Sequence, residues 1–231
     1  MADPPVSSTS VQGPAMQLVS VQVGKPSKLG TKGAADPFDL PWTTGYRKWA
    51  IEGPVFCGRL NLDGDGQHDR RWHGGPDMAV LAYSADHYSR WRSELGWAET
   101  GPGAFGENLT VEGCDEATVC LGDVWSVGSA RLQVSEPRKP CNNISRFHHR
   151  TGLLQLVIET GRFGWYLRVL AEGSLQAGDH IALLERPHPE WTVARAMRAR
   201  LGKSKDPAEA AALAVVPALG ADWRERLAAK E

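Results

Sequence analysis

Most of the chain consists of short runs that alternate hydrophobic and polar residues and are separated by turn-forming residues. The stretch MQLVSVQVG at 16–24 alternates in this way and is rich in β-branched residues, which predicts a strand. Glycine, aspartate and proline recur between further runs of this kind, for example throughout 110–137 and 167–187. Short strands joined by frequent turns predict a mainly β protein, built as a barrel or a sandwich.

Two segments with helical spacing interrupt the predicted strands. The first is expected to begin at Ser84, which serves as the N-cap, and to end near Gly96. The second is expected to begin at Thr151 and to end at Gly161. The spacing of the aromatic and aliphatic residues in the first segment predicts one face that packs on the core, formed by Tyr88, Trp91 and Leu95.

After a proline-rich linker near residue 187, the chain becomes rich in alanine, arginine and leucine. Asp206 followed by Pro207 fits an N-cap and a first helical residue. Two or three short helices are therefore expected, packed on the β domain or on a second copy of the chain. The helical segments are 191–202, 206–219 and 220–230.

The composition is that of an ordinary globular protein. The 231 residues are 42% hydrophobic, and the formal net charge of −1 provides no overall field that would attract nucleic acid or an acidic membrane. No segment approaches the roughly 20 apolar residues of a membrane span. Residues 1–15 are rich in serine and proline without a targeting pattern, so we expect them to be disordered, with Met16 as an alternative natural start.

The cysteine spacing gives little support to a structural zinc site or a disulfide framework, because none of the four cysteines forms a CxxC pair. A chain of this size can be stabilised by its core alone, so reduced thiols and a cytoplasmic location are expected. The cysteines are Cys57, Cys114, Cys120 and Cys141.

Cys141 lies in the stretch SEPRKPCNNI, directly after two prolines and two basic residues. Positive charge from Arg138 and Lys139 favours the thiolate, which is the nucleophile and the metal ligand. The prolines stiffen the loop, so it could present the sulfur to a soft metal. A buried and inert cysteine at the end of a strand explains the same residues equally well, and both interpretations stay open.

A second candidate site is the stretch DGDGQHDRRWHGGPD at 63–77. Two glycines would let the backbone approach a ligand closely, and two arginines could hold a phosphate. His68 and His73 could bind a metal, but no third ligand matches their spacing. A solvated turn with ion pairs is the alternative. The residues singled out for phosphate binding are Arg70, Arg71, Gly74 and Gly75.

The third candidate is the loop GAFGENLTVEG at 103–113, which leads into a strand. Glu107 could accept hydrogen bonds from a pterin or a base, and Asn108 could both donate and accept them. A turn held by its own side chains is the alternative. Elsewhere, the chain has no GxGxxG after a strand, no P-loop, no GxSxG and no haem-binding CxxCH, so any electrons must come from another protein.

Several segments in the same order resemble the MOSC domain family, named after the C-terminal domain of molybdenum cofactor sulfurase, and within it the YiiM-like subgroup. The resemblance covers roughly residues 17–187, with a weaker match in the tail. One departure is Glu136, where the family often has glutamine before Pro-Arg. The matching segments are VGKP at 23–26, TTGYRKWAIEGPV at 43–55, LDGDGQHDRRWHGGPDMAVLAYSADHY at 62–88, GAFGENLTVEG at 103–113, CLGDVWSVGSARLQVSEPRKPC at 120–141 and GWYLRVLAEGSLQAGDHIAL at 164–183.

The resemblance implies a β-barrel with a few flanking helices and a short C-terminal helical region. We therefore expect a disordered leader at 1–16, a MOSC barrel domain at 17–187 and a helical region at 188–231.

The family also implies a molybdopterin cofactor, with Cys141 as the protein ligand of molybdenum. The resemblance implies a phosphate site formed by basic residues, and it places three further residues near the pterin or the substrate. The basic residues are Arg70, Arg71, Arg138 and Lys48, and the other three are His73, Glu107 and Asn108.

The implied activity is reduction of N-hydroxylated compounds, including hydroxylaminopurine base analogues, which would detoxify them. Cleaving an N–O bond needs two electrons and two protons, so an acid must protonate the leaving oxygen, and His73 or Glu107 is expected to do so. A separate flavoprotein reductase would supply the electrons. Many family members are dimers, and a homodimer through the tail is an expectation.

Three other functions remain open at this stage. The chain could deliver the cofactor or sulfur without turnover, and Cys141 would then carry a persulfide or the pterin. It could be a binding module that stacks a purine or pterin on Trp72 or Phe105. It could also be a cysteine hydrolase that pairs Cys141 with His148 or His149, which would need no metal.

Overall fold

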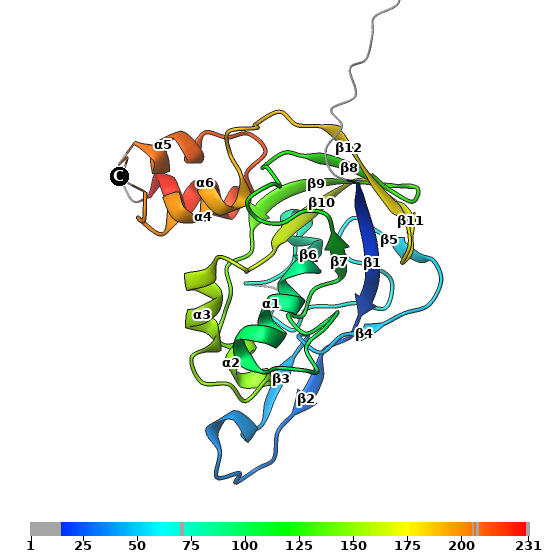
Figure 1. The fold of residues 1–231 in the computed structure, drawn as a ribbon, viewed down its shortest axis with the longest axis vertical. Helices are drawn as coiled ribbons and strands as arrows, with labels where there is room; N and C mark the ends of the chain where they lie inside the picture. Colours follow the sequence, from blue (N-terminus) through cyan, green and yellow to red (C-terminus); the bar gives the residue numbers. More distant parts are fainter. Residues whose placement is uncertain (1–14, 70–71, 205, 207, 230–231) are drawn as a thin grey trace, which may run out of the picture.

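The computed structural model describes residues 15–69, 72–204, 206 and 208–229, and within them seven strands form a closed barrel (Figure 1). The ring closes where Met16 and Gln17 pair with Ile181 and His180. The predicted mainly β barrel fold is therefore confirmed. In order around the barrel, the strands are β12 (His180–Glu185), β8 (Val124–Val127), β9 (Ala130–Pro137), β10 (Trp165–Ala171), β6 (Val80–Ser84), β7 (Leu109–Glu112) and β1 (Met16–Val23).

Neighbouring barrel strands are antiparallel except for β6 and β7, which are parallel. A parallel pair needs a crossover connection, and α1 (Asp86–Leu95) provides it. The loop after α1 carries residues 103–108, so the third candidate segment of the sequence lies where this crossover re-enters the barrel. β1 begins at Met16, so that residue of the expected leader belongs to the barrel, while residues 1–14 lie outside the described residues.

Short pieces of structure extend the barrel at its ends. β2 and β3 pair with each other, β5 pairs with β11, and β4 pairs with the end of β1. Two 3₁₀ helices lie in the connecting loops. These elements are β2 (Ser27–Leu29), η1 (Pro37–Asp39), β3 (Trp42–Thr44), β4 (Trp49–Ala50), β5 (Val55–Cys57), η2 (Pro76–Met78) and β11 (Gly173–Leu175).

The predicted helix ends are right, but the predicted starts are wrong. Gly96 ends α1 and Gly161 ends α3 (Leu153–Thr160), both with positive φ, because glycine adopts the left-handed conformation without strain. Ser84 is instead the last residue of β6 and is buried, and α1 begins two residues later. The N-cap of α3 is Gly152, one residue after the predicted cap at Thr151.

One helix was missed altogether. α2 (Asn143–Phe147) begins two residues after Cys141 and is only five residues long. A helix of five residues is too short to show a repeating pattern of hydrophobic positions, so the sequence offered no signal for it. Its position has a chemical consequence, since the backbone of its first residue faces the cysteine.

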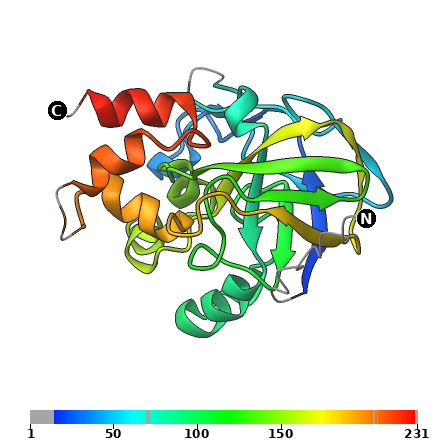
Figure 2. The same ribbon diagram turned by 90° about the horizontal axis from the view of Figure 1, so that it is seen from above.

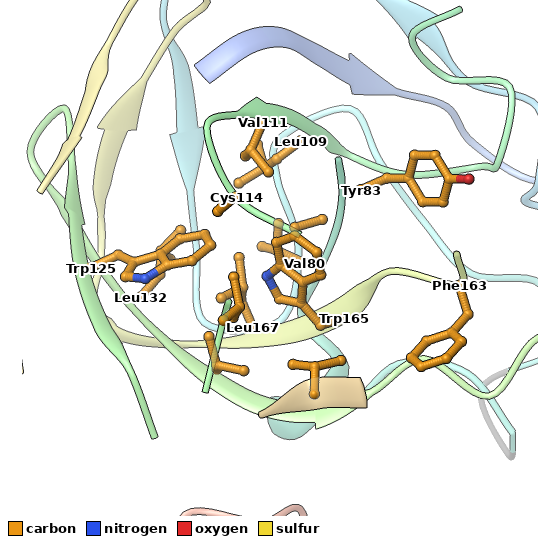
Figure 3. Close-up of a cluster of buried hydrophobic side chains, with 14 of the residues drawn as sticks. Val80, Tyr83, Leu109, Val111, Cys114, Trp125, Leu132, Phe163, Trp165 and Leu167 are labelled. Atoms are coloured by element: carbon orange, nitrogen blue, oxygen red, sulfur yellow. The ribbon is translucent and has the colours of Figure 1, made fainter. Parts of the chain in front are cut away.

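The barrel interior holds a dense aromatic and aliphatic core (Figure 3). Trp125 and Trp165 come from different strands and meet edge to face, with ring centroids 6.1 Å apart. The face of α1 predicted to be apolar packs on this core, because Tyr88 and Trp91 are buried and Leu95 is partly buried against it. Burial of such large side chains is the main source of folding free energy.

The C-terminal segment forms three helices grouped at one side of the barrel (Figures 1 and 2). Asp206 accepts a hydrogen bond from the Ala208 nitrogen at 2.9 Å, but the following helix begins only at Glu209. The predicted start at Asp206 is therefore too early, and Pro207 lies outside the described residues. The helices are α4 (Val193–Arg200), α5 (Glu209–Ala214) and α6 (Ala221–Ala228).

A small polar network holds α6 against the barrel. Asp77 of η2 accepts a hydrogen bond from the first backbone nitrogen of α6 at 2.9 Å and pairs with Arg168 of β10, also at 2.9 Å. Arg168 in turn donates to the Ala218 carbonyl at 2.9 Å. The tail thus packs on the barrel, one of the two arrangements expected. Among the described helices, none is long and apolar enough to cross a bilayer.

Candidate functional site

A cavity of about 370 Å³ lies beside the barrel and contains most of the candidate residues of the sequence. Segments far apart in the chain form its walls, which is the usual arrangement of a small-molecule site. They are the β3 region, the loop that contains His73, and the segment between β9 and α2. The lining residues used below are Trp42, Tyr46, Lys48, His68, His73, Gly74, Asn108, Arg138, Lys139, Cys141 and Tyr166.

Cys141 lies on the rigid turn between β9 and α2, and its side chain is half-buried. Burial alone would raise the pKa of its thiol, but the hydrogen bond from His73, the charge of Arg138 and the hydrogen bond from the Asn143 backbone outweigh burial. The net effect is a pKa below the usual range of cysteine. The sulfur is therefore suited to react or to bind a soft metal.

The other three cysteines lie in the opposite kind of surroundings. Burial raises the pKa of Cys57 to about 12 and that of Cys120 to about 11, and it raises the pKa of Cys114 as well. These thiols stay protonated and inert at neutral pH. Of the two interpretations left open for Cys141, the structure favours the reactive one.

Arg138 lies beside Cys141 in the wall of the cavity and is only 5% exposed. Its guanidinium is 6.0 Å from the ring centre of Tyr46, yet its Nη1 atom is buried and has no hydrogen-bond partner among the described residues. A buried cation with an unfilled donor is costly unless an anion or water completes it. The position therefore points to an anion held at this wall.

Lys48 provides a second cation, but it is paired inside the protein. Its ammonium group contacts Asp65, and burial lowers the pKa of Lys48 even though Asp65 opposes this. Asn108 donates to the other Asp65 oxygen at 2.9 Å and accepts a hydrogen bond from the Leu81 nitrogen at 3.1 Å. Lys48 and Asn108 thus line the cavity, within a network whose acidic member the sequence did not single out.

His73 and its neighbouring glycines form another part of the wall. His73 lines the cavity with its side chain against Cys141. Gly74 and Gly75 have φ values of 99° and 91°, and a Cβ atom at Gly74 would lie 3.0 Å from the Gln67 side chain. Glycine is therefore required at both positions by the backbone. Arg70 and Arg71, the first two candidate phosphate ligands, lie outside the described residues.

Glu107 does not face the cavity. It is fully buried, and its carboxylate accepts hydrogen bonds from the Gly103 nitrogen at 2.7 Å and from the Phe105 nitrogen and the Thr110 hydroxyl at 3.0 Å each. The hydroxyl of Tyr88 donates to it as well. Such a carboxylate holds its loop in place, so its position does not favour the expected role as a proton donor.

The remaining candidates from the alternative functions lie elsewhere. Phe105 is fully buried and stacks on Tyr83 with ring centroids 4.4 Å apart, so its faces are covered. His148 donates to the Ala104 carbonyl at 2.5 Å, and burial lowers its pKa to about 4. His149 faces Asp36 and Asp39 at the surface. Neither histidine lines the cavity with Cys141, which disfavours the hydrolase.

Tyr166 is a site residue that the sequence did not indicate. It comes from β10, lines the cavity beside Arg138 and Cys141, and burial raises its pKa to about 12. The sequence alone does not show whether the side chain of Tyr166 faces the cavity or the other side of the strand. The pairing of β10 with β9 in the folded protein decides this.

Comparison with known proteins agrees with this architecture. The model of the MOSC domain matches residues 69–182, and that of the YiiM-like, 3-alpha helix domain matches residues 191–230. A protein of Gibberella moniliformis described as "Reductase" is 41% identical over 164 residues, 68% of this chain and 28% of that protein. The chain thus spans less than a third of that relative.

Two bacterial proteins match over nearly the whole chain. The uncharacterized protein YflK of Bacillus subtilis is 36% identical over 207 residues, which cover 90% of both proteins. The crystal structure of YiiM from Geobacillus stearothermophilus superposes with a TM-score of 0.77 at 33% identity, covering 93% of this chain and 98% of that one. With its barrel and its three C-terminal helices, this chain belongs to the MOSC domain family and to its YiiM-like members.

Proposed function

We propose that this protein is a molybdenum-cofactor-dependent reductase of N-hydroxylated compounds, such as hydroxylaminopurine base analogues. The observation that carries the proposal is the pairing, in one cavity, of a low-pKa thiol at Cys141 with a buried and incompletely bonded cation at Arg138. Family membership and a relative described as a reductase add support.

The cavity fits the chemical character of that cofactor. Molybdopterin carries a soft metal and a phosphate, and the cavity offers a thiolate sulfur and buried cations. Cys141 would ligate the metal, while Arg138, assisted by Lys48, would hold the phosphate. The unfilled Nη1 donor of Arg138, in the wall of this cavity, supports an anion site there. When bound, the cofactor supplies two-electron redox chemistry that can accept an oxygen atom.

The protein's own residues would prepare the cavity for this chemistry. The hydrogen bond from the His73 side chain, the charge of Arg138 and the hydrogen bond from the Asn143 backbone lower the pKa of Cys141. Of the two residues expected as the proton donor, His73 lines the cavity and Glu107 does not. We infer that His73 delivers a proton to the leaving oxygen. The overall reaction consumes two electrons and two protons per N–O bond and releases water, and a separate flavoprotein would supply the electrons.

Turnover tests this proposal directly. Protein purified from a host that makes the cofactor is supplied with a reduced viologen dye and 6-hydroxylaminopurine, and the amine product is measured. We expect Cys141→Ala to lose at least about 100-fold in rate, because the metal ligand is removed. The matched control Cys120→Ala should keep its activity, since that thiol lies outside the cavity.

The same assay separates the reductase from a delivery protein. Bound cofactor with no turnover by any donor would favour delivery of the cofactor or of sulfur. Full activity in Cys141→Ala would contradict both functions, because each of them depends on this sulfur.

A further inference from the structure

A second cavity, of about 350 Å³, lies between the barrel and the C-terminal helices. α6 forms one of its walls, and the end of β9 forms another. Six residues, Cys141 among them, line both cavities. A molecule in the second cavity would therefore lie beside the same thiol as a group bound in the first. The shared residues are His73, Met78, Lys139, Cys141, Asn143 and Tyr166.

Aromatic side chains give this second cavity flat surfaces. Trp72 is 51% exposed, and Trp223 of α6, which is almost fully buried, also lines the cavity. The guanidinium of Arg226 is 5.4 Å from the ring centre of Trp72, and that of Arg200 is 4.1 Å from the ring centre of Trp223. An exposed indole such as that of Trp72 offers a flat apolar surface on which a further planar ring packs well.

Glu136 places a buried carboxyl group in the same cavity, with only 4% of the residue exposed. Burial, together with the negative charges of Asp77 and Asp222, raises the pKa of Glu136 to about 8, although Arg200 and Arg168 oppose this. At neutral pH the group is therefore mostly a neutral acid, which can donate one hydrogen bond and accept another side by side.

The fold holds this carboxyl group in a fixed place. The α6 start packs so tightly on it that a Cβ atom at Gly220 would lie 2.0 Å from the Glu136 Oε2 atom. The Gly220 nitrogen donates to the Ser135 carbonyl at 3.1 Å, next to Glu136 in β9. The Asp77–Arg168 network then fixes the same end of α6. The C-terminal helices thus complete a wall that the barrel lacks.

The geometry points to the second cavity as the binding site for an uncharged, planar nitrogen heterocycle, recognised by a paired donor and acceptor at Glu136 and packed against the exposed indole of Trp72. This inference rests on the proposed function for the role of that ring as the organic part of the substrate. The binding itself needs neither metal nor cofactor, so it can be tested without turnover.

The probe is 9-methyladenine, which has an adjacent donor and acceptor on one edge and no acidic ring N–H. Binding is measured by calorimetry and by quenching of tryptophan fluorescence, using Cys141→Ala protein so that neither cofactor nor thiol contributes. We expect saturable binding at about pH 6.5 that becomes about tenfold weaker at about pH 9, as the carboxyl group ionises and loses its donor.

Substitutions at Glu136 assign that pH dependence. Glu136→Gln keeps a donor and an acceptor at every pH, so it should bind at both pH values with similar affinity. Glu136→Leu should bind at least about tenfold more weakly at both. Glu225→Gln is the matched control on the exposed face of α6 and should behave like the parent. The charged and titratable groups that face Glu136 are Asp77 of η2, Arg168 and Tyr166 of β10, Arg200 of α4 and Asp222 of α6.

The inference is overturned if 9-methyladenine fails to bind, if Glu136→Leu binds as well as the parent, or if Glu136→Gln keeps the full pH dependence. Thermal melting of each variant confirms that it is folded before binding is scored. Failure of the proposed function gives a different pattern, in which the probe binds but the wild-type protein reduces no N-hydroxylated compound.

Discussion

Two buried charged residues near the same cavity show how alike a structural and a functional group look in sequence. The carboxylate of Glu107 accepts hydrogen bonds from two backbone nitrogens, a threonine and a tyrosine, so both of its oxygens are bonded within the protein. Arg138 is almost as deeply buried, yet its Nη1 atom has no described partner and lies beside a reactive thiol. Complete hydrogen bonding explains Glu107 as a support of its loop, whereas an unfilled donor in the wall of a cavity is what the proposed phosphate site at Arg138 requires.

A second buried carboxylate, that of Glu116, follows the pattern of Glu107. His87 donates to Glu116 at 2.6 Å, and the other Glu116 oxygen accepts from the Gly164 nitrogen at 2.6 Å. These groups tie α1 to the loop before β10, away from Cys141. The contrast therefore lies in the hydrogen bonding, because both oxygens of each carboxylate are bonded within the protein while Arg138, equally buried, keeps an unfilled donor.

The largest expected effect concerns the cysteines, which allow the same comparison between structural and functional surroundings within a single residue type. In native protein at about pH 8, iodoacetamide should modify Cys141 at least about 100-fold faster than Cys57 or Cys114, because only Cys141 has a lowered pKa. Its rate should rise with pH to a midpoint below the usual cysteine range. Peptide mass spectrometry measures each site. Equal rates at all sites, or no shift of the midpoint in Arg138→Ala, would break the comparison.

The next effect is on stability, where the two buried charges should behave in opposite ways. Glu107→Gln places an amide donor against groups that themselves donate, and we expect it to lower the free energy of unfolding by about 3 kcal/mol. Arg138→Met removes an uncompensated charge and should leave stability unchanged or raise it by about 1 kcal/mol. Urea unfolding of cofactor-free protein measures both. A large loss in Arg138→Met with none in Glu107→Gln would reverse our assignment.

The smallest expected effect is on cofactor retention. Arg138→Ala should retain about tenfold less pterin after gel filtration, because the phosphate loses its buried donor while Lys48 and Cys141 remain. Arg131→Ala removes an exposed arginine of the same strand and should retain as much as the wild type. Pterin is measured by fluorescence after oxidation. Equal retention in both variants would place the phosphate elsewhere.

The sequence predicted the parts of this fold that depend on local patterns. Alternating residues gave the barrel strands, and glycines gave the ends of α1 and α3, since both signals act within a few residues. The predicted N-cap at Ser84 was wrong because serine also occurs at the end of a strand, and here Ser84 is the last residue of β6. α2 escaped notice because five residues carry no period.

The site was only partly predictable for a related reason. Cys141, Arg138 and Lys48 were identified from residue type and from the family resemblance, and they do line one cavity. Three of the four hydrogen-bond partners of Glu107 lie within four residues of it, so the alternative of a turn held by its own side chains describes this loop, and only Tyr88 comes from another element. Tyr166 becomes a site residue only through its strand register.

The most direct test of the central claim is the molybdenum content of protein purified from a host that makes the cofactor. Elemental analysis should find about one molybdenum per chain in the wild type and in Cys120→Ala, and almost none in Cys141→Ala. Wild-type protein without molybdenum, even after reconstitution, or Cys141→Ala protein that retains it, would contradict the account.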